Sequence, residues 1–403
     1  MSEIGNKPGD LRVFGVSGSN GKTTTAWLLH ALLEAAGHRV GRFTDLGPQL
    51  GAGGADLGAP RSRGEAVRRA LEGMAEDGCT MAVLEVSSQL LDDRAFAGLA
   101  LDTAVVINLG AGRLEGHDRH ESYLSAKLGL FDQLSTDGTL VVNLDDPHHT
   151  AFLERGGTER PLMTFSLRGH PDADLVGTVF GISLDGTELA LRYRGEEQPL
   201  KSPMIGLHNV ENVLAAVAAA LASGIDLLAA ARVVARFNGV PGRLEKIPVN
   251  AGFTVFRDRA QAPDAFERVL ATMRALATRR LLVLFGCGSR QSDDERRGMG
   301  RIVECLADRV IVTSDRIDAE GTAAFMDEVR GGMIEPELVP MLADRTTAIR
   351  AILAEAKRGD VVLLAGTGPE FETTEKTEST VADDRDVVRA WRDERQERIE
   401  QAG

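Results

Sequence analysis

The sequence predicts an α/β fold of two domains, each built on a mainly parallel sheet with helices on both faces. Short, continuously apolar runs alternate with helical stretches, which is typical of strands buried on both faces. Only residues 173–201 read as shorter strands of alternating polarity, such as Glu188–Tyr193. A second series of strands and helices begins at about residue 253. We therefore expect a P-loop-type parallel sheet with a small antiparallel annex, followed by a smaller doubly wound domain.

In the first half of the chain, apolar runs bounded by turn residues predict the parallel strands. A helix is expected between the first two strands, from Lys22 to about Ala36, and a strongly apolar helix follows the annex at residues 210–222. The expected strands lie at residues 11–16, 81–85, 103–107 and 139–143.

A domain boundary is expected after Asn238-Gly-Val-Pro-Gly-Arg243, where turn-forming residues are dense. This gives a first domain at residues 1–243 and a second at residues 244–403. The order of strands and helices in the second domain is typical of a Rossmann-like, doubly wound sheet. Its strands are expected at residues 281–285, 309–313 and 360–365, and its last, charged helix at residues 386–402.

Composition describes an ordinary globular protein and disfavours several partners. A chain of 403 residues, 43% of them hydrophobic, can bury a substantial core. Its formal charge of −14 disfavours nucleic acid or an anionic membrane as the main partner, since both require a basic surface. No apolar run is long enough to span a membrane and no signal peptide is recognisable, so we expect a cytoplasmic protein without membrane insertion. The three cysteines form no CxxC pair, which argues against a zinc site, and a monomer is the default expectation.

The segment Gly18-Ser-Asn-Gly-Lys-Thr-Thr24 has the features of a phosphate-binding loop. It leaves a predicted strand and opens a predicted helix, so backbone N–H groups and the positive end of the helix would converge on a triphosphate. Glycines let the backbone approach the phosphates, Lys22 would neutralise the β- and γ-oxygens, and Thr23 could hold Mg²⁺. The spacing is the shorter G-x-x-G-K-[ST] form. The predicted nucleotide-binding residues are Gly18, Ser19, Asn20, Gly21, Lys22, Thr23 and Thr24.

Beyond the loop, a series of short motifs runs through nearly the whole chain. They are Leu84–Ser88, Ser125–Phe131, Asn143–Asp146, Gly206–Asn212, Gly239–Arg243, Phe285–Gly288, Thr313–Asp315 and Asp383–Arg385. In this order, and together with the loop in residues 16–25, they resemble the landmarks of the Mur ligase family, above all its MurE-type members. The resemblance implies a central ATP-binding domain and a C-terminal domain of that family.

The resemblance also implies that Thr23, Glu85 and Lys127 hold Mg²⁺, with Lys127 carbamylated so that it becomes an anionic ligand. Glu85 ends an apolar strand, where a carboxylate is costly unless it meets a cation. Read without the family, Glu85 could be a solvated acid, and Lys127 could be a lysine whose stem lies among apolar residues while its amine reaches water.

Three further nucleotide contacts are implied by the resemblance: Asn209 with adenine, Arg243 with phosphate and Asp258 with ribose. The implied catalytic residues are Lys22, Lys127 and Arg243. Without the family, Asn209 would be a helix cap and Arg243 a surface charge.

The implied activity is ATP-dependent formation of an amide bond. A substrate carboxylate would attack the γ-phosphate to form an acyl phosphate, which the amino group of an amino acid would then attack. Positioning and charge neutralisation would carry the first step, and Lys22 and Mg²⁺ would supply both. Peptidoglycan precursor synthesis is the expected pathway, with a small carboxylate acceptor and an amino acid as partners.

Several positions depart from the family. The phosphate-loop strand starts at about residue 11, so the family's preceding domain for the uridine nucleotide is expected to be missing. The family's Asp-His pair aligns with Gly112 and Arg113, and a guanidinium cannot ligate a cation because it has no acceptor. His117 is kept, whereas the diaminopimelate signature is replaced at Asp315–Asp318. We interpret this as a kept ATP site and a changed acceptor site.

Two other functions stay open on these departures. One is an amide ligase of another pathway, which the missing domain favours. The other is a nucleotide-binding paralogue without ligase activity, which Arg113 and Gln261 favour. A plain P-loop kinase is disfavoured, because it would leave Lys127 and the motif at Gly206–Asn212 unexplained.

Overall fold

The computed structural model describes residues 10–50, 60–93, 96–109, 124, 127–156, 159–260, 262–286, 291–313, 319–366 and 382–402. Within these residues the chain forms two compact units, the first ending at Gly239 and the second beginning at Val240. The domain limits expected from the sequence, 1–243 and 244–403, stay predictions.

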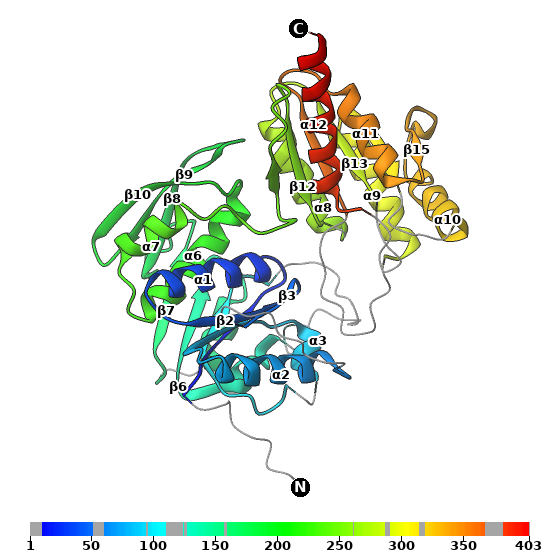
Figure 1. Cartoon of the computed structure of the whole chain (residues 1–403). Helices are drawn as coiled ribbons and strands as arrows, with labels where there is room; N and C mark the ends of the chain where they lie inside the picture. Colours follow the sequence, from blue (N-terminus) through cyan, green and yellow to red (C-terminus); the bar gives the residue numbers. More distant parts are fainter. Residues whose placement is uncertain are drawn as a thin grey trace. The chain divides into compact units, whose positions relative to one another are not determined.

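The first unit is built on one mixed sheet with helices around it (Figure 1). Its strands are β1 (Arg12–Ser17), β2 (Val40–Thr44), β3 (Gly47–Gln49), β4 (Met81–Glu85), β5 (Leu101–Val106), β6 (Leu134–Asn143), β7 (Leu162–Ser166), β8 (Leu175–Ser183), β9 (Gly186–Tyr193) and β10 (Glu196–Ser202). Its helices are α1 (Lys22–Ala35), α2 (Arg63–Glu76), α3 (Ser88–Leu91), α5 (His149–Gly156), α6 (Leu207–Ala222) and α7 (Leu227–Val234), with a 3-10 turn, η1 (Phe131–Gln133).

The strand order of this sheet is β10-β9-β8-β7-β6-β5-β1-β4-β2-β3. Neighbours from β2 to β8 pair in parallel, whereas β2 with β3, β8 with β9 and β9 with β10 pair antiparallel. The predicted parallel sheet and antiparallel annex are confirmed. The annex continues the same sheet, because β8 pairs with β7.

Helices cover both faces of the sheet because strand side chains alternate between faces and both sets are apolar. On β1, Phe14 and Val16 pack in the core beneath α1 and α6, whereas Val13 packs in the core on the α2 side. Figure 1 shows α1 and α6 on one side of the strands and α2 on the other. Residues 210–222, predicted to be a strongly apolar helix, form most of α6.

Strand β1 lies between β4 and β5, so its carboxyl end is flanked by theirs. Val16 of β1 is in register with Glu85 of β4 and Val105 of β5. The chain continues to β2 and β4 on one side of β1 and to β5 on the other. In open α/β sheets, ligands bind outside the carboxyl ends of strands at such a reversal of strand order.

The second unit has a smaller sheet with the strand order β11-β12-β16-β13-β14-β15. All neighbours pair in parallel except β11 with β12. Its strands are β11 (Glu245–Ile247), β12 (Thr254–Asp258), β13 (Leu281–Phe285), β14 (Arg309–Thr313), β15 (Met341–Leu342) and β16 (Val361–Ala365). Its helices are α8 (Pro263–Leu276), α9 (Asp293–Leu306), α10 (Ala319–Arg330), α11 (Arg345–Glu355) and α12 (Asp384–Ala402), with a 3-10 turn, η2 (Pro336–Leu338).

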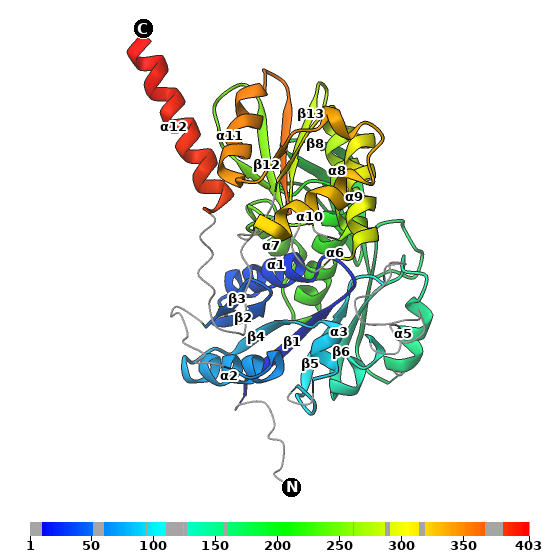
Figure 2. The same cartoon turned by 90° about the vertical axis from the view of Figure 1, so that its right-hand side faces the viewer.

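Figure 2 shows α11 and α12 on one side of these strands and α8 and α9 on the other. The core on the first side joins Ile349 and Ile352 of α11 to Val388 of α12 and to the strands. The expected Rossmann-like, doubly wound sheet is therefore confirmed.

The start of α12 is tied to the second sheet by buried charges. Arg345 makes a bidentate ion pair with Asp384, with both contacts at 2.7 Å and both side chains 2% exposed. Arg257, 1% exposed, bridges Glu245 of β11 at 3.0 Å and Asp383 at 2.7 Å. Pairing of this kind is needed, because an uncompensated buried charge is strongly destabilising.

The strands missed by the sequence analysis are those with weak apolar patterns. Strand β2 contains Gly41 and Arg42, and β3 contains Pro48, which interrupt an apolar run. In contrast, the unbroken runs at residues 81–85, 281–285 and 309–313 form strands with the expected limits.

The most apolar helix, α6, has most of its residues buried within the first unit. In the part of the chain that the structure describes, no helix combines the length and apolar character needed to cross a membrane.

Replacement of Arg345 by methionine (Arg345→Met) should lower the free energy of unfolding of the second unit by roughly 3–5 kcal/mol, because Asp384 would stay buried without its cation. Urea unfolding followed by the fluorescence of Trp391 measures this loss, since Trp391 packs on Phe253 with ring centroids 5.8 Å apart. A Trp27→Phe background removes the other tryptophan signal. The control is Arg350→Met, which breaks a half-exposed pair with Glu394 and should lower the free energy of unfolding far less, because solvent screens an exposed pair. Equal losses in the two variants would contradict the prediction.

Candidate functional site

The loop between β1 and α1 carries the predicted phosphate-binding residues. Gly21 is the N-cap of α1 with φ 87°, in the left-handed region that favours glycine. A Cβ at Gly21 would lie 1.9 Å from Oδ1 of Asn212, so α6 leaves room only for glycine there. The start of α1 has no side-chain cap, and helix N-termini of this kind bind anions through their N–H groups.

The amines of Lys22 and Lys127 converge on one carbonyl oxygen. Lys22 Nζ donates to Gly18 O at 3.0 Å and to Ser19 O at 3.3 Å. Lys127 Nζ donates to the same Gly18 O at 3.3 Å and to Ser17 Oγ at 3.2 Å. The charge of Lys22 gives this point a positive local field, which favours the binding of an anion.

Lys127 is only 4% exposed, so its amine does not reach water as the alternative interpretation required. Burial, and then the charge of Lys22, lower the pKa of Lys127 from 10.5 to about 7, against an opposing effect of Glu85. A lysine with such a pKa is largely neutral at slightly alkaline pH. Carbamate formation requires that neutral amine as the nucleophile.

Glu85 is buried at the carboxyl end of β4 and is 2% exposed. Its Oε2 accepts from Thr23 Oγ1 at 2.9 Å and from the backbone N–H of Asp45 at 2.9 Å. Asp45 in turn pairs with Arg63 at 2.5 Å. These bonds satisfy the buried carboxylate, and they exclude the interpretation of Glu85 as a solvated acid.

The donor set fits a Mg²⁺ site once Lys127 carries a carboxylate. Thr23 Oγ1 and Glu85 Oε2 are hard oxygen atoms held 2.9 Å apart. Mg²⁺ at nucleotide sites is bound by one or two carboxylates together with substrate phosphates. The amine of Lys127 is a nitrogen donor and becomes a suitable ligand only as a carbamate. Among the residues that the structure describes, no three His, Cys, Asp or Glu side chains gather in a way that could hold a metal.

Asn209 lies inside the first unit and is bonded through both ends of its amide. Its Nδ2 donates to Ile205 O at 2.9 Å, and its Oδ1 accepts from Asn212 Nδ2 at 3.2 Å. Asn212 also contacts Thr25, whose Oγ1 donates to Asn212 Oδ1 at 3.5 Å. The two asparagines of the motif therefore fasten α6 to the phosphate loop and the start of α1.

The second unit holds Arg243 and Asp258. Asp258 is 6% exposed, and its carboxylate accepts from the backbone N–H groups of Leu244 and Ala260, both at 2.7 Å. Burial raises the pKa of Asp258, while Arg243 and these two backbone bonds oppose the shift. The structure thus places Arg243 close enough to Asp258 for their charges to interact.

Several residues discussed in the sequence analysis lie outside the described residues. They are Gly112, Arg113, His117, Gln261 and residues 315–318. The motif that contains Lys127 is described only in part, since Ser125 and Ala126 also lie outside.

Four residues near the loop were not singled out as site residues from the sequence: Ser17, Asp45, Asn108 and Asn212. Ser17 and Asn212 lie inside the motifs at residues 16–25 and 206–212, and a polar side chain within such a motif is a usable signal. Asn108 and Asp45 follow the ends of β5 and β2, and polar residues at strand ends are a usable signal.

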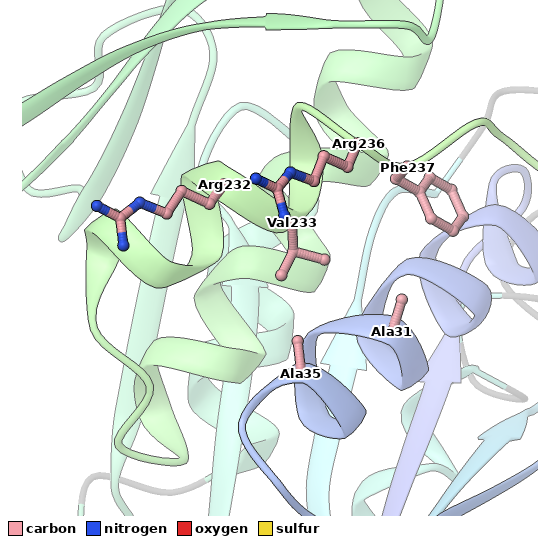
Figure 3. A pocket seen from close by; sticks show the side chains of 6 residues that line it. All are labelled: Ala31, Ala35, Arg232, Val233, Arg236 and Phe237. Carbon is pink, nitrogen blue, oxygen red and sulfur yellow. The ribbon is translucent and has the colours of Figure 1, made fainter.

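A small hollow in the first unit lies away from these groups. It has a volume of about 310 Å³ and is lined by Ala31, Ala35, Arg232, Val233, Arg236 and Phe237 (Figure 3). Ala31 and Ala35 lie in the second half of α1, roughly 14–20 Å along the helix from Lys22 at 1.5 Å per residue. The hollow is therefore separate from the phosphate loop.

Two family profiles match the chain. The profile of the Mur ligase middle domain matches residues 16–220, and that of the Mur ligase, glutamate ligase domain matches residues 242–368. A UDP-N-acetylmuramoyl-L-alanyl-D-glutamate–2,6-diaminopimelate ligase of Chlorobaculum tepidum is 35% identical over 373 residues, covering 91% of this chain and 73% of the relative. The enzyme of the same name from Syntrophomonas wolfei is 32% identical over 382 residues, covering 94% and 77%.

Solved structures are similar over most of the chain. A UDP-N-acetylmuramoyl-L-alanyl-D-glutamate–2,6-diaminopimelate ligase matches with a TM-score of 0.69 and 29% identity, covering 96% of this chain and 79% of the other. A folylpolyglutamate synthase of Mycobacterium tuberculosis, complexed with ADP and AMPPCP, matches with a TM-score of 0.70 and 19% identity, covering 96% and 91%. The second match supports the fold alone.

The stability of the protein should depend on pH through Lys127. Its pKa is about 7 in the folded state against 10.5 for an ordinary lysine, so the unfolded state binds more protons between these values. The cost of burying the charged amine is fully present below pH 7 and is relieved as the pH rises toward 10.5. Relative to Lys127→Met, the wild-type free energy of unfolding should therefore rise with pH, by at most about 1.4 kcal/mol per unit.

Urea unfolding of both proteins across this pH window, in CO₂-free buffer with a chelator, measures the difference. Parallel pH profiles would show that Lys127 is charged in the folded state throughout the window.

Proposed function

The chain belongs to the Mur ligase family, and from this premise we propose that it joins the carboxylate of a peptidoglycan precursor to an amino acid, with ATP as the energy source. The observation that carries the proposal is the convergence of two lysine amines, a buried glutamate and a threonine hydroxyl on the loop that opens α1. A structural role alone does not account for two lysine amines that share the Gly18 carbonyl oxygen.

In this proposal the phosphate loop holds the nucleotide. The N–H groups at the start of α1 face the β- and γ-phosphates, and the amine of Lys22 neutralises their charge. Asn209, Arg243 and Asp258 are the further nucleotide contacts that we propose, on the strength of the family resemblance.

Thr23, Glu85 and carbamylated Lys127 would hold Mg²⁺. When bound, the ion would neutralise charge on the phosphate oxygens as the γ-phosphoryl group is transferred. The protein's own contribution is to keep Lys127 buried and its amine neutral, so that the amine can take up CO₂ and become anionic. Glu85 is held in place by Thr23 and by the Asp45 amide, and both bonds fix the orientation of its carboxylate.

The proposed reaction has two steps. The substrate carboxylate attacks the γ-phosphorus of ATP, which forms an acyl phosphate and releases ADP. The neutral amino group then attacks the acyl carbon, the bond between that carbon and the phosphate oxygen breaks as the amide bond forms, orthophosphate leaves, and a proton of the amine passes to solvent. Charge neutralisation by Lys22 serves the first step, in which negative charge gathers at the transferred group.

For the acceptor, we propose a UDP-linked muramoyl peptide with a free carboxylate, since the relatives of up to 35% identity are ligases of that substrate. The amino acid is best identified by experiment, because the residues at 315–318 differ from the diaminopimelate signature.

Orthophosphate release should appear only when Mg²⁺-ATP, a UDP-muramoyl peptide and one amino acid are all present. Lys22→Met should lower kcat at least about 100-fold, because a preorganised donor to the transferred phosphoryl group is lost. Lys201→Met is the matched control, since Lys201 is half-exposed beside Glu188 and should leave kcat unchanged.

A panel of acceptors and amino acids separates the alternatives. Turnover with a non-muramoyl carboxylate would place the chain in another pathway. Nucleotide binding without turnover on any pair would contradict ligase activity.

Lys127→Ala should abolish turnover, and short carboxylic acids should restore part of it by replacing the missing carbamate oxygens. A readout besides activity is the ¹³C NMR signal of a carbamate in protein prepared with ¹³C-bicarbonate. That signal should be present in the wild type and absent from Lys127→Ala. An unchanged spectrum in the variant would contradict carbamylation of Lys127.

A further inference from the structure

We propose that Asn108 is a positioning residue that fixes the conformation of the phosphate loop, and that Asn143 and Asp146 hold Asn108 in place. The inference rests on the proposed function, because the loop's task is to bind a nucleotide. It assigns a role to Asn108 and to the motif Asn143-Leu-Asp-Asp146, which the proposed chemistry does not use.

The first half of the loop lies along the segment that follows β5. Ile107 N donates to Ser17 O at 3.0 Å, and Ser19 N donates to Asn108 O at 3.0 Å. Gly18 permits this close approach, since a Cβ there would lie 3.2 Å from the Cβ of Ile107. The parallel pairing of β1 with β5 therefore continues past the last strand residues into the loop.

The side chain of Asn108 makes the next bond in this series. Asn20 N donates to Asn108 Oδ1 at 3.1 Å. Because the donor is an N–H group, the acceptor must be the amide oxygen, which fixes the orientation of the Asn108 side chain. Asn108 thus binds two successive N–H groups of the loop, one through its backbone oxygen and one through its side chain.

This pairing directs two of the loop amides away from the phosphates. Ser19 and Asn20 use their N–H groups on Asn108, so we assign direct phosphate binding to the amides at the start of α1. The bonds to Asn108 also set the path of the loop through the Gly18 carbonyl, on which both lysine amines converge.

Asn108 is itself held from both sides by the end of β6. Asn143 Nδ2 donates to Ile107 O at 3.0 Å, on one side of Asn108. On the other side, Leu109 N donates to Asp146 Oδ2 at 2.5 Å. Asn143 and Asp146 are 4% and 6% exposed, so these bonds form where water competes little.

The carboxylate of Asp146 is held in turn. Its Oδ1 accepts from the N–H of His148 at 2.8 Å, and the Nδ1 atom of His148 lies 3.2 Å from the same oxygen. A continuous series of hydrogen bonds therefore runs from the turn after β6 through Asn108 to the phosphate loop. Neighbouring strand ends keep the loop in its binding conformation, so the loop loses less conformational freedom when a nucleotide binds.

Calorimetric titration of the full-length protein with Mg²⁺-ADP tests the inference. Asn108→Ala should weaken ADP binding roughly 5- to 20-fold, because the N–H of Asn20 loses its acceptor. Asn108→Ser carries an oxygen too close to its own backbone to reach Asn20 and should give a loss of the same sign. In turnover, the KM for ATP should rise in both variants, while the KM for the amino acid stays within about twofold.

Two further variants distinguish a positioning role of Asn108 from a general loss of stability in the first unit. Gln133→Ala removes a bond of the same kind elsewhere in this unit, where Oε1 accepts from Gly98 N at 2.9 Å, and should bind ADP as the wild type does. Asn108→Asp keeps an acceptor for Asn20 but adds a charge near the phosphates. Its loss should largely disappear at high salt, which screens that charge.

The outcomes are distinct. ADP binding by Asn108→Ala and Asn108→Ser within about twofold of the wild type overturns the inference, as does an equal loss in Gln133→Ala. A wild-type protein that binds no ADP overturns the proposed function and the inference together. Losses in the two Asn108 variants without an acceptor, together with wild-type binding by Gln133→Ala and a normal KM for the amino acid, support it.

Discussion

The candidate site depends on one carbonyl oxygen, that of Gly18, which accepts hydrogen bonds from two lysine amines. This arrangement requires a glycine loop that can turn its carbonyl toward both amines. It also requires Lys127 to be buried beside a second cation, which is the reason its pKa falls to about 7. The phosphate loop, the proposed metal ligands and the reactive lysine are thus parts of one electrostatic arrangement.

The sheet supplies the geometry for that arrangement. Because β1 lies between β4 and β5, the loop that follows it has Glu85 on one side and Asn108 on the other. On the β4 side lie the proposed metal ligands, where the Glu85 carboxylate accepts a hydrogen bond from Thr23. On the β5 side, the amide side chains of Asn108 and Asn143 bond to backbone groups and hold the loop in its conformation. One loop therefore serves two purposes, since neighbouring strands present different kinds of side chain to it.

Much of this could be predicted from the sequence, and the rest could not for physical reasons. An unbroken apolar run such as residues 81–85 predicts a buried strand, whereas Gly41 and Arg42 interrupt the apolar pattern of β2, so that β2 was not predicted. Glu85 could be found because a charge at the end of an apolar strand is conspicuous. Lys127 was assigned through its motif, since by itself a lysine among apolar residues was equally compatible with an amine that reaches water. The position of Asn108 after β5 marks it as a candidate, but its role could not be predicted, because its partner is a backbone group 88 positions away and bonds to the backbone leave no pattern of paired residue types. The amide of Asn209 bonds to Ile205 and Asn212 within its own unit, and its contact with adenine stays a prediction from the family resemblance.

The buried ion pairs at the start of α12 have a consequence for how the protein is made. Asp383 pairs with Arg257, and Asp384 pairs with Arg345. Both acids leave the ribosome well after the two arginines and Glu245. Until then, the nascent second unit carries guanidinium groups that it cannot bury without cost, although its sheet strands have all been synthesised. Closure of this unit is therefore delayed until residues 383 and 384 have been synthesised, while the first unit, whose described site pairs all lie before Gly239, can already be folded. A nascent chain that pauses before α12 is expected to need protection by chaperones during that interval.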